Sequence, residues 1–129
     1  MTTPDSDAHE CLTKLEALKA QIDAIMELIG EQRRLYPPQK EQAQDMLRGV
    51  KDELSAEYRR TRTSRARADM DSIEATCYAP AIRDAYVHLE IRTNSVPGTV
   101  WIHDLYEVAM DLEFAIRPLR EKLENKHSA

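Results

Sequence analysis

The sequence predicts an all-α fold, an antiparallel helical bundle of four to five helices, and three observations lead to this prediction. Apolar residues recur at steps of three and four over long stretches, which places them on one face of a helix. Proline and glycine divide the chain into segments of helical length. The 42% hydrophobic and 32% charged content suits a chain of 129 residues with one core. We therefore expect residues 1–129 to form a single helical domain, with residues 1–6 as a disordered tail.

The longest apolar stripe lies in residues 99–126, around which the remaining segments should pack. Its members share one helix face: Trp101, Leu105, Val108, Leu112, Ala115, Ile116, Leu119 and Leu123. A helix with one apolar face needs partners to cover it, so the upstream helices should supply that cover. Pro118 should kink this helix or end its regular hydrogen bonding just before Leu119. Because aromatic residues are few, Trp101 and Phe114 are expected as isolated large residues in an aliphatic core.

The first helix is expected to begin at Asp7, which has Glu10 three residues later in a capping-box spacing. Its apolar residues keep the heptad spacing of a coiled-coil seam: Cys11, Leu15, Leu18, Ile22, Ile25 and Ile29. The seam lasts only about three heptads, which favours a packed bundle helix. Pro37 and Pro38 are expected to end this helix and start the next.

The second helix is predicted over 39–58, with an inner face of Ala43, Leu47, Val50 and Leu54. Gly49 within it either allows a close helix crossing or is neutral. A third apolar series (Ala66, Met70, Ile73 and Cys77) is about 100° out of phase with the second. This predicts a break near residues 61–64, with one long helix as the alternative.

After Pro80, residues 81–92 are predicted to form a short helix. Its inward residues should be Ile82, Ala85, Tyr86 and Leu89. Residues 93–98, Thr-Asn-Ser-Val-Pro-Gly, carry the clearest turn signal in the chain. The last helix follows this turn.

Charge is distributed unevenly along the chain. The formal net charge of -5 argues against a protein that coats nucleic acid over its whole surface. Residues 59–67 nevertheless contain no acid and five arginines: Arg59, Arg60, Arg62, Arg65 and Arg67. Acidic residues of the same fold, a protein partner or a nucleic acid could neutralise this segment. The acids considered within the fold are Glu53, Glu57, Asp69 and Asp71. Apart from Tyr58 at its edge, the segment lacks the interleaved aromatics that stack on bases.

A second pattern lies in residues 83–88, Arg-Asp-Ala-Tyr-Val-His. Arg83 is followed by the polar Asp84 and, five residues on, by His88. This resembles the HEPN family of small all-helical ribonucleases and toxins, and Val100-Trp101 opening a long last helix is similar to some members. The resemblance implies a metal-independent endoribonuclease with its catalytic residues in a dimer cleft. His88 would move a proton at the ribose 2′-OH or leaving oxygen, Arg83 would stabilise phosphate charge, and Asp84 would orient them. Residues five apart on a regular helix point about 140° apart, so Arg83 and His88 converge only at a helix start, a bend or a dimer cleft.

Metal and thiol chemistry are not predicted. His103 and Glu107 have the i, i+4 spacing that lets one helix offer two metal ligands, with Asp104 and Asp111 nearby. A catalytic metal would need further ligands from other helices, so a solvated face is the expectation, and no metal or cofactor is assigned. Cys11 and Cys77 are expected to be reduced packing residues, because disulfides are rare in the cytosol. No Cys/His spacing resembles a zinc site.

The N-terminus lacks the features of a secretion signal, and no uncharged apolar run is long enough to cross a bilayer. We therefore expect a cytoplasmic protein with no membrane partner. The leading hypothesis is a regulator, inhibitor or assembly subunit that binds a protein through an exposed helix face or the arginine-rich segment. The alternatives are the HEPN-like ribonuclease and an accessory nucleic-acid-binding subunit that uses residues 59–67. A homodimer is a further candidate assembly, and the HEPN resemblance implies one.

Overall fold

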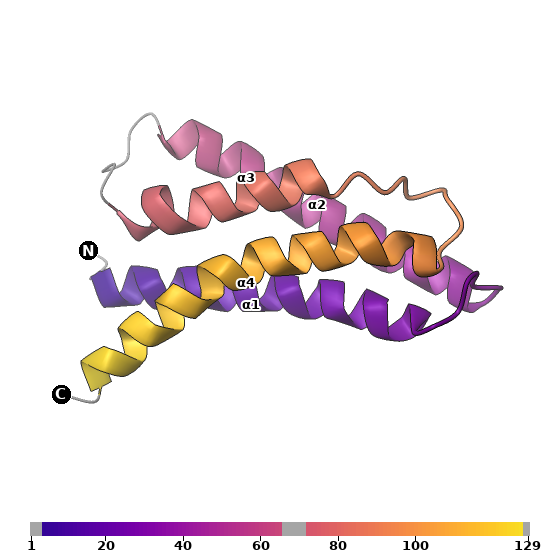
Figure 1. Ribbon diagram of the computed structural model, residues 1–129. Coiled ribbons are helices and arrows are strands. Elements are labelled where there is room, and N and C mark those ends of the chain that lie inside the picture. The colour runs from indigo at the N-terminus through magenta and orange to yellow at the C-terminus, as the bar shows by residue number, and fades with distance from the viewer. Residues whose placement is uncertain (1–3, 66–71, 128–129) are drawn as a thin grey trace.

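The computed structural model describes residues 4–65 and 72–127, and over these residues the chain is helical with no strand (Figure 1). The elements in chain order are α1 (Pro4–Ile29), α2 (Gln39–Arg65), the short π-helix η1 (Glu74–Tyr78), α3 (Ala79–His88) and α4 (Thr99–His127). Successive α-helices run in opposite directions, and the first and last helical turns of the described chain lie at the same end of the bundle (Figure 1). The predicted all-α antiparallel bundle is confirmed.

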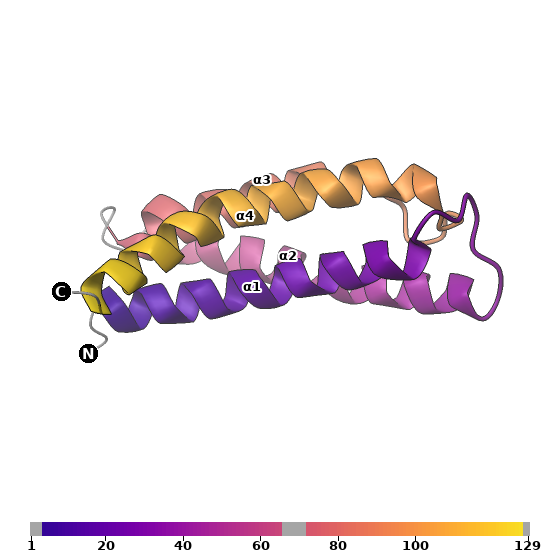
Figure 2. The ribbon, with the colours of Figure 1, turned by 60° about the horizontal axis from the view of Figure 1, so that its bottom comes forward.

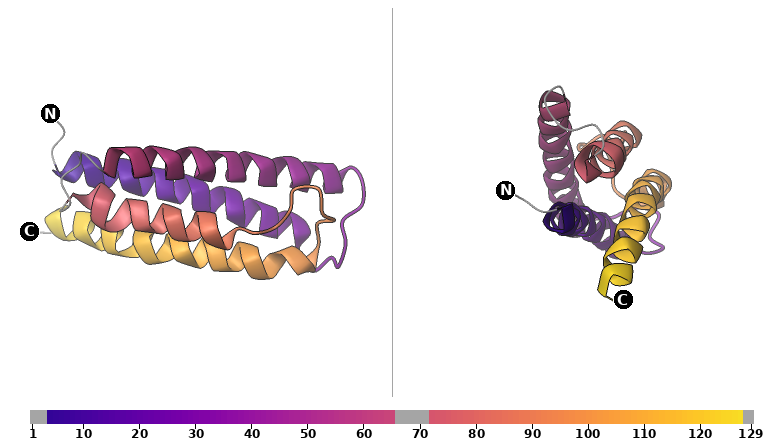
Figure 3. Two further views of the ribbon diagram at one scale, coloured as in Figure 1. Left: turned by 90° about the horizontal axis from the view of Figure 1, so that it is seen from above. Right: turned by 90° about the vertical axis from the view of Figure 1, so that its left-hand side faces the viewer.

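Helix α1 provides the central seam of the core. Its seven buried residues are at most 7% exposed: Ala8, Cys11, Leu15, Leu18, Ile22, Ile25 and Ile29. α1 packs mainly on α4 and also on α2 and η1, and Figure 2 shows α1 and α4 side by side along their length. In the end view of Figure 3 the four α-helices surround one common core. The predicted inner faces of α1, α2 and α4 are therefore buried together.

Both ends of α1 differ from the prediction. The helix begins at Pro4 rather than Asp7, because proline suits a first helical turn, where its missing N–H leaves no hydrogen bond unmade. It ends at Ile29, well before Pro37 and Pro38. Gly30 stops it by adopting a φ of 56°, and its N–H donates to the Met26 carbonyl at 2.9 Å. A left-handed glycine directly after the last turn is a common helix terminator.

Helix α2 continues through Arg65, so the break predicted near residues 61–64 is wrong. Two threonine hydroxyls donate to carbonyls of the preceding turn, Thr61 to Tyr58 and Thr63 to Arg59, both at 3.0 Å. Local bonds of this kind keep the side chains compatible with a helix. Of the third apolar series, Ala66 and Met70 lie outside the described residues.

Pro80 does not interrupt the helix around it. η1 runs directly into α3, and the Ala79 N–H donates to the Glu74 carbonyl five residues earlier. This wide turn places Pro80 in the first turn of α3, where a missing N–H is tolerated. α3 ends at His88, four residues before the predicted end. Tyr86 is 42% exposed rather than inward, whereas the other predicted inward residues are buried: Ile82, Ala85 and Leu89.

The predicted turn over residues 93–98 packs against the loop that follows α1. Leu35 donates its N–H to the Pro97 carbonyl at 2.8 Å, and Thr99 donates to the Gln32 carbonyl at 3.0 Å. Between these two hydrogen bonds, Gly98 lies so close to Arg33 that an added Cβ would stand 2.0 Å from the Arg33 carbonyl oxygen. The loop after α1 and the turn before α4 therefore meet backbone to backbone at a point where only glycine fits.

Helix α4 remains helical through Pro118, and its C-terminal part turns away from the line of its N-terminal part (Figure 1). Trp101 is buried as predicted, and its indole N–H donates to the Ser95 hydroxyl at 3.1 Å. Phe114 is not a core residue, because it is 67% exposed on the outer side of the helix. Among the described helices, none has both the length and the apolar character needed to cross a bilayer.

Replacement by alanine should have opposite effects on stability at Gly98, in the turn before α4, and at Gly49, within α2. Gly98→Ala should lower the free energy of unfolding by at least about 2 kcal/mol, since the methyl group overlaps backbone that cannot withdraw without breaking two hydrogen bonds. Gly49→Ala should raise it by about 1 kcal/mol, because a Cβ there meets no atom within 4 Å and alanine is the better helix former. Urea unfolding of both variants checks this. Equal stability of the two variants would contradict the close approach at Gly98.

Candidate functional site

The arginine-rich segment is helical as far as it can be described. Arg59, Arg60 and Arg62 lie in the last turns of α2 and are exposed. Arg65 ends this helix, and its side chain lies outside the described part of the chain, as does the whole of Arg67. The five arginines were predicted as one cluster, but three can be placed, and they do not share one role.

Arg60 is held by acids of its own fold. Its guanidinium donates to both carboxylate oxygens of Glu57, at 3.1 and 3.2 Å, and lies 2.5 Å from Glu74 of η1. The buried Tyr78 donates its hydroxyl to Glu57 at 2.5 Å, and the Arg60 guanidinium lies 5.8 Å from the centre of the Tyr78 ring. Lys14 of α1 is 3.6 Å from Glu57. We call Lys14, Glu57, Arg60, Glu74 and Tyr78 the Glu57 network; it joins three helical elements.

The electrostatics of this network favour charged Glu57 and neutral Tyr78. Although partial burial raises the pKa of Glu57, hydrogen bonds from Arg60 and Tyr78 outweigh it and lower the pKa below its ordinary value. Burial and the Glu57 carboxylate both raise the pKa of Tyr78. Of the acids considered from sequence, Glu57 is thus a true partner of the arginine segment. Glu53 instead accepts a hydrogen bond from Gln21, and Asp69 and Asp71 are outside the described residues.

Arg62 takes part in a second contact between α2 and α3. The Tyr58 and Tyr86 rings stack with their centres 4.5 Å apart and 9° between their planes. The Arg62 guanidinium lies 5.5 Å from the centre of the Tyr58 ring, a cation–π distance. Both tyrosines are therefore engaged within the fold on at least one ring face, which limits their use as a platform for nucleic-acid bases.

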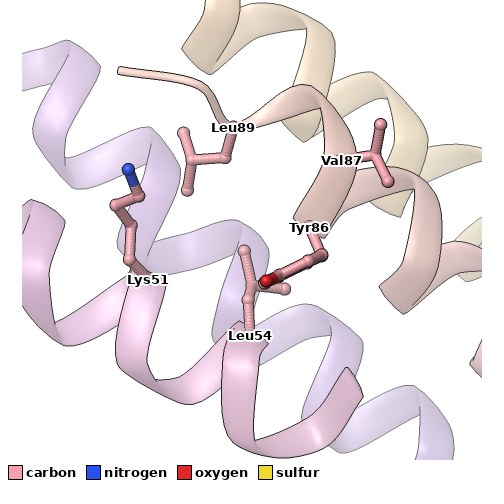
Figure 4. Close-up of a pocket in the computed structure, with 5 residues that line it drawn as sticks. All are labelled: Lys51, Leu54, Tyr86, Val87 and Leu89. Carbon is pink, nitrogen blue, oxygen red and sulfur yellow. The ribbon is translucent and has the colours of Figure 1, made fainter. Parts of the chain in front are cut away.

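A small hollow of about 280 Å³ opens beside this stack between α2 and α3. In Figure 4 the side chains of Leu54 and Tyr86 point toward one another, with Lys51 and Leu89 beside them. Lys51 donates to the Ile91 carbonyl at 2.5 Å, so its ammonium group holds the segment after α3. The volume lies below that of most small-molecule sites, and the hollow is better described as a packing joint.

The residues of the HEPN-like pattern lie on α3, where they separate into two contacts. The Arg83 guanidinium lies 3.4 Å from the carboxylate of its neighbour Asp84, and both groups are at least partly exposed. His88, the last residue of α3, faces α4 instead. Its Nδ1 is 2.6 Å from Asp111 Oδ2, and its Nε2 is 3.6 Å from Glu107 Oε1. A single copy of the chain therefore does not bring Arg83 and His88 together, as their spacing on one regular helix anticipates.

The contacts of His88 perturb its ionisation. The hydrogen bond with Asp111 raises the pKa of His88, and the nearby Glu107 and Asp84 carboxylates add to this effect.

The same region of α4 carries His103, Asp104 and Glu107, whose possible ligand atoms all lie within 4.8 Å of one another. The outer side of the α3–α4 pair thus gathers two histidines and four carboxylates.

The outer face of α4 also carries a feature that the sequence analysis missed. Tyr106 is 60% exposed and Phe114 is 67% exposed, and Met110 lies half-buried between them. These three residues, which we call the aromatic ridge, are spaced four apart and so follow one side of the helix. The sequence did carry a signal for an exposed ridge, because Tyr106, Met110 and Phe114 all lie outside the apolar series that faces the core.

The two cysteines do not belong to the Glu57 network, the His88 contacts or the aromatic ridge. Cys11 and Cys77 are both free, as predicted. Burial raises the pKa of the Cys11 thiol to about 11 and also raises that of Cys77. Thiols of raised pKa are poor nucleophiles at neutral pH, so their contribution is packing.

Comparison with protein-family models, with curated proteins and with solved structures found no significant match to this chain. The geometry of the described residues is therefore the basis for any functional conclusion.

Loss of the Glu57 charge should change how stability depends on pH. Because the native pKa of Glu57 is lowered, its ionisation stabilises the fold fully above its ordinary pKa, and this contribution is lost as pH falls through the native pKa. Glu57→Gln should therefore lower the free energy of unfolding at neutral pH by about 1–2 kcal/mol, and by less near pH 3. Urea unfolding at both pH values measures the difference. The exposed Glu31→Gln serves as control, and a Glu57→Gln deficit that does not shrink in acid would refute the proposed cause.

Proposed function

We propose that this chain is a small cytoplasmic helical-bundle protein that binds a protein partner through the aromatic ridge on α4. The observation that carries the proposal is the pair of large aromatic residues, Tyr106 and Phe114, exposed on one side of a helix whose other side is fully packed. Phe114 is the one phenylalanine of the chain. Aromatic residues and methionine are enriched in the cores of protein interfaces, where burial of each ring is strongly favourable.

The spacing of the ridge fits a helix-in-groove mode of binding. Tyr106, Met110 and Phe114 present side chains at i, i+4 and i+8, the pattern by which an amphipathic helix anchors itself in an apolar groove. Met110 adds a flexible apolar side chain that adapts to the shape of a partner. A rigid helix that already packs on α1 and α3 loses little conformational freedom when the ridge is covered.

Charge around the ridge indicates the chemistry of the partner. Glu107 and Glu121 are seven residues before and after Phe114, so they lie on nearly the same side of α4. A partner with an apolar groove edged by lysine or arginine would complement this arrangement. The ridge would bind the groove, and the flanking carboxylates would contribute mainly to association rate and specificity.

The arginine-rich segment is a secondary candidate for the binding surface. Arg60 is occupied by Glu57 and Glu74, so reversing its charge would disturb the fold as well as any binding surface. Arg59 is exposed and is a cleaner position for testing a role of α2 in binding protein or nucleic acid, whereas Arg62 also contacts the Tyr58 ring.

Substitution of Phe114 tests the proposal directly. Phe114→Ser and Tyr106→Ser should each reduce capture of a partner from extract of the source cells at least tenfold, because each removes a ring that the interface buries. The control is Tyr36→Ser, since Tyr36 is a comparably exposed aromatic, at 68%, on the loop after α1. Quantitative mass spectrometry of the captured proteins measures the effect, and circular dichroism verifies that each variant is folded.

The outcomes separate the competing explanations. Loss of one protein with both ridge variants but not with Tyr36→Ser supports the proposal. Equal capture by all four proteins, or equal loss with Tyr36→Ser, rejects it. A concentration-dependent dimer in analytical ultracentrifugation that Phe114→Ser abolishes would identify the partner as a second copy of the chain.

The HEPN-like ribonuclease stays a prediction with its own test. It would require His88 of one copy to meet Arg83 of another, because the two side chains make separate contacts within one copy. We expect mixed single-stranded RNA to remain intact when incubated with the purified protein in excess chelator. Cleavage that disappears in His88→Ala, followed on a denaturing gel, would favour the ribonuclease over the interaction protein.

A further inference from the structure

The α4 helix offers part of a metal-ion site by itself. His103 and Glu107 are one helical turn apart, and Asp104 lies beside them. One nitrogen or oxygen atom from each of these three residues lies within 4.8 Å of the others. Ligands from a single helix leave half of the coordination sphere open, so the sequence spacing alone did not justify a site.

The fold supplies the missing ligand from α3. His88 ends that helix against α4, and its Nε2 lies 3.6 Å from Glu107 Oε1. Two ligand atoms that share a tetrahedral zinc ion, each about 2.0–2.1 Å from it, lie about 3.3 Å apart. The separation of His88 and Glu107 is therefore close to one edge of a coordination tetrahedron. Because His88 lies outside the group of three residues whose ligand atoms are within 4.8 Å of one another, its ring must move toward His103 to complete a site.

Asp111 determines which nitrogen of His88 is available to a metal. Its Oδ2 lies 2.6 Å from Nδ1, and a carboxylate can only accept a hydrogen bond, so Nδ1 carries the proton. The Nε2 atom of the neutral ring then presents its lone pair toward Glu107. A histidine oriented through its second nitrogen by a carboxylate is the usual arrangement behind a metal ligand.

We propose that His88, His103 and Glu107 form a zinc-binding site that bridges α3 and α4, with Asp104 as a further oxygen ligand and Asp111 as the positioning residue. Two imidazoles and a carboxylate suit zinc, whereas calcium and magnesium require mainly oxygen ligands. Asp84, one turn before His88, adds negative charge that favours a cation. The ion would link the end of α3 to the N-terminal third of α4, and the partly exposed position leaves coordination open to water.

Zinc titration of the chelator-treated protein tests this proposal. Isothermal calorimetry should give one ion per chain, and His88→Ala, His103→Ala and Glu107→Gln should each weaken binding at least tenfold. Asp111→Asn should weaken it by about tenfold or more while keeping all three ligands, because it removes the orienting carboxylate. The matched control is His9→Ala, an exposed histidine on α1 that should leave affinity unchanged.

A second readout is independent of the calorimetry. Zinc should raise the thermal unfolding temperature of the unsubstituted protein and of His9→Ala, and should raise that of His88→Ala much less, because a variant that binds the ion more weakly gains less stability at the same zinc concentration. Absence of zinc binding overturns the proposal. Undiminished affinity in His88→Ala also overturns it, since the ion would then sit on α4 alone. Circular dichroism of each variant without zinc establishes that any loss is not unfolding.

Discussion

Burial of the α1 seam is the constraint on which the rest of the bundle depends. Its seven residues form one apolar strip along the helix, and α4, α2 and η1 all pack against α1. Removing this much apolar surface from water is the dominant favourable contribution to folding, and the contact between α1 and α4 is the most extensive one between two helices in the described part of the chain. Because α1 fixes where α2 and α4 lie, it also fixes where α3 can pack. The meeting of α3 and α4 that places His88 against Asp111 is thus a distant consequence of the α1 seam.

Polar contacts refine this apolar arrangement at its two ends. At one end the turn over residues 93–98 is hydrogen-bonded to the loop after α1, with Gly98 pressed against Arg33. Toward the other end the Glu57 network joins α1, α2 and η1 around the buried Tyr78 hydroxyl. Charged hydrogen bonds of this kind add modest stability but strong geometric preference, because a buried polar group left without its partner is costly. The two sets of contacts therefore fix how far each helix slides along its neighbours.

The α4 helix combines a structural and a functional surface. Its inner side completes the core, while its outer side carries the aromatic ridge and, beside it, the carboxylates and histidines that face α3. A helix used in this way needs support from both flanks so that exposed apolar residues remain in place without a partner. Ion pairs to α1, between Arg120 and Glu16 and between Lys19 and Glu113, provide part of that support. The ridge and the proposed zinc site thus rest on the same well-packed element.

The outcome for the arginines shows where sequence reasoning stops. Five arginines in nine residues left three partners open, namely acids of the same fold, a protein or a nucleic acid. In the structure Arg60 is paired with Glu57 and Glu74, and Arg62 lies over Tyr58. Glu57 could be proposed from sequence because it lies one turn before Arg60 on the same helix. Glu74 could not, because it comes from another element whose rotation the local sequence does not specify.

The sequence by itself determined the helical class, the buried face of each long helix and the turn before α4. Three- and four-residue spacing specifies which side of its own helix a residue occupies, and that information is local. Tertiary structure decided the end of α3 at His88, the outward position of Phe114 and the approach of His88 to Glu107 and Asp111. These features depend on the rotation and axial position of one helix relative to another, which follow from packing of the whole core and leave no periodic signal in either helix.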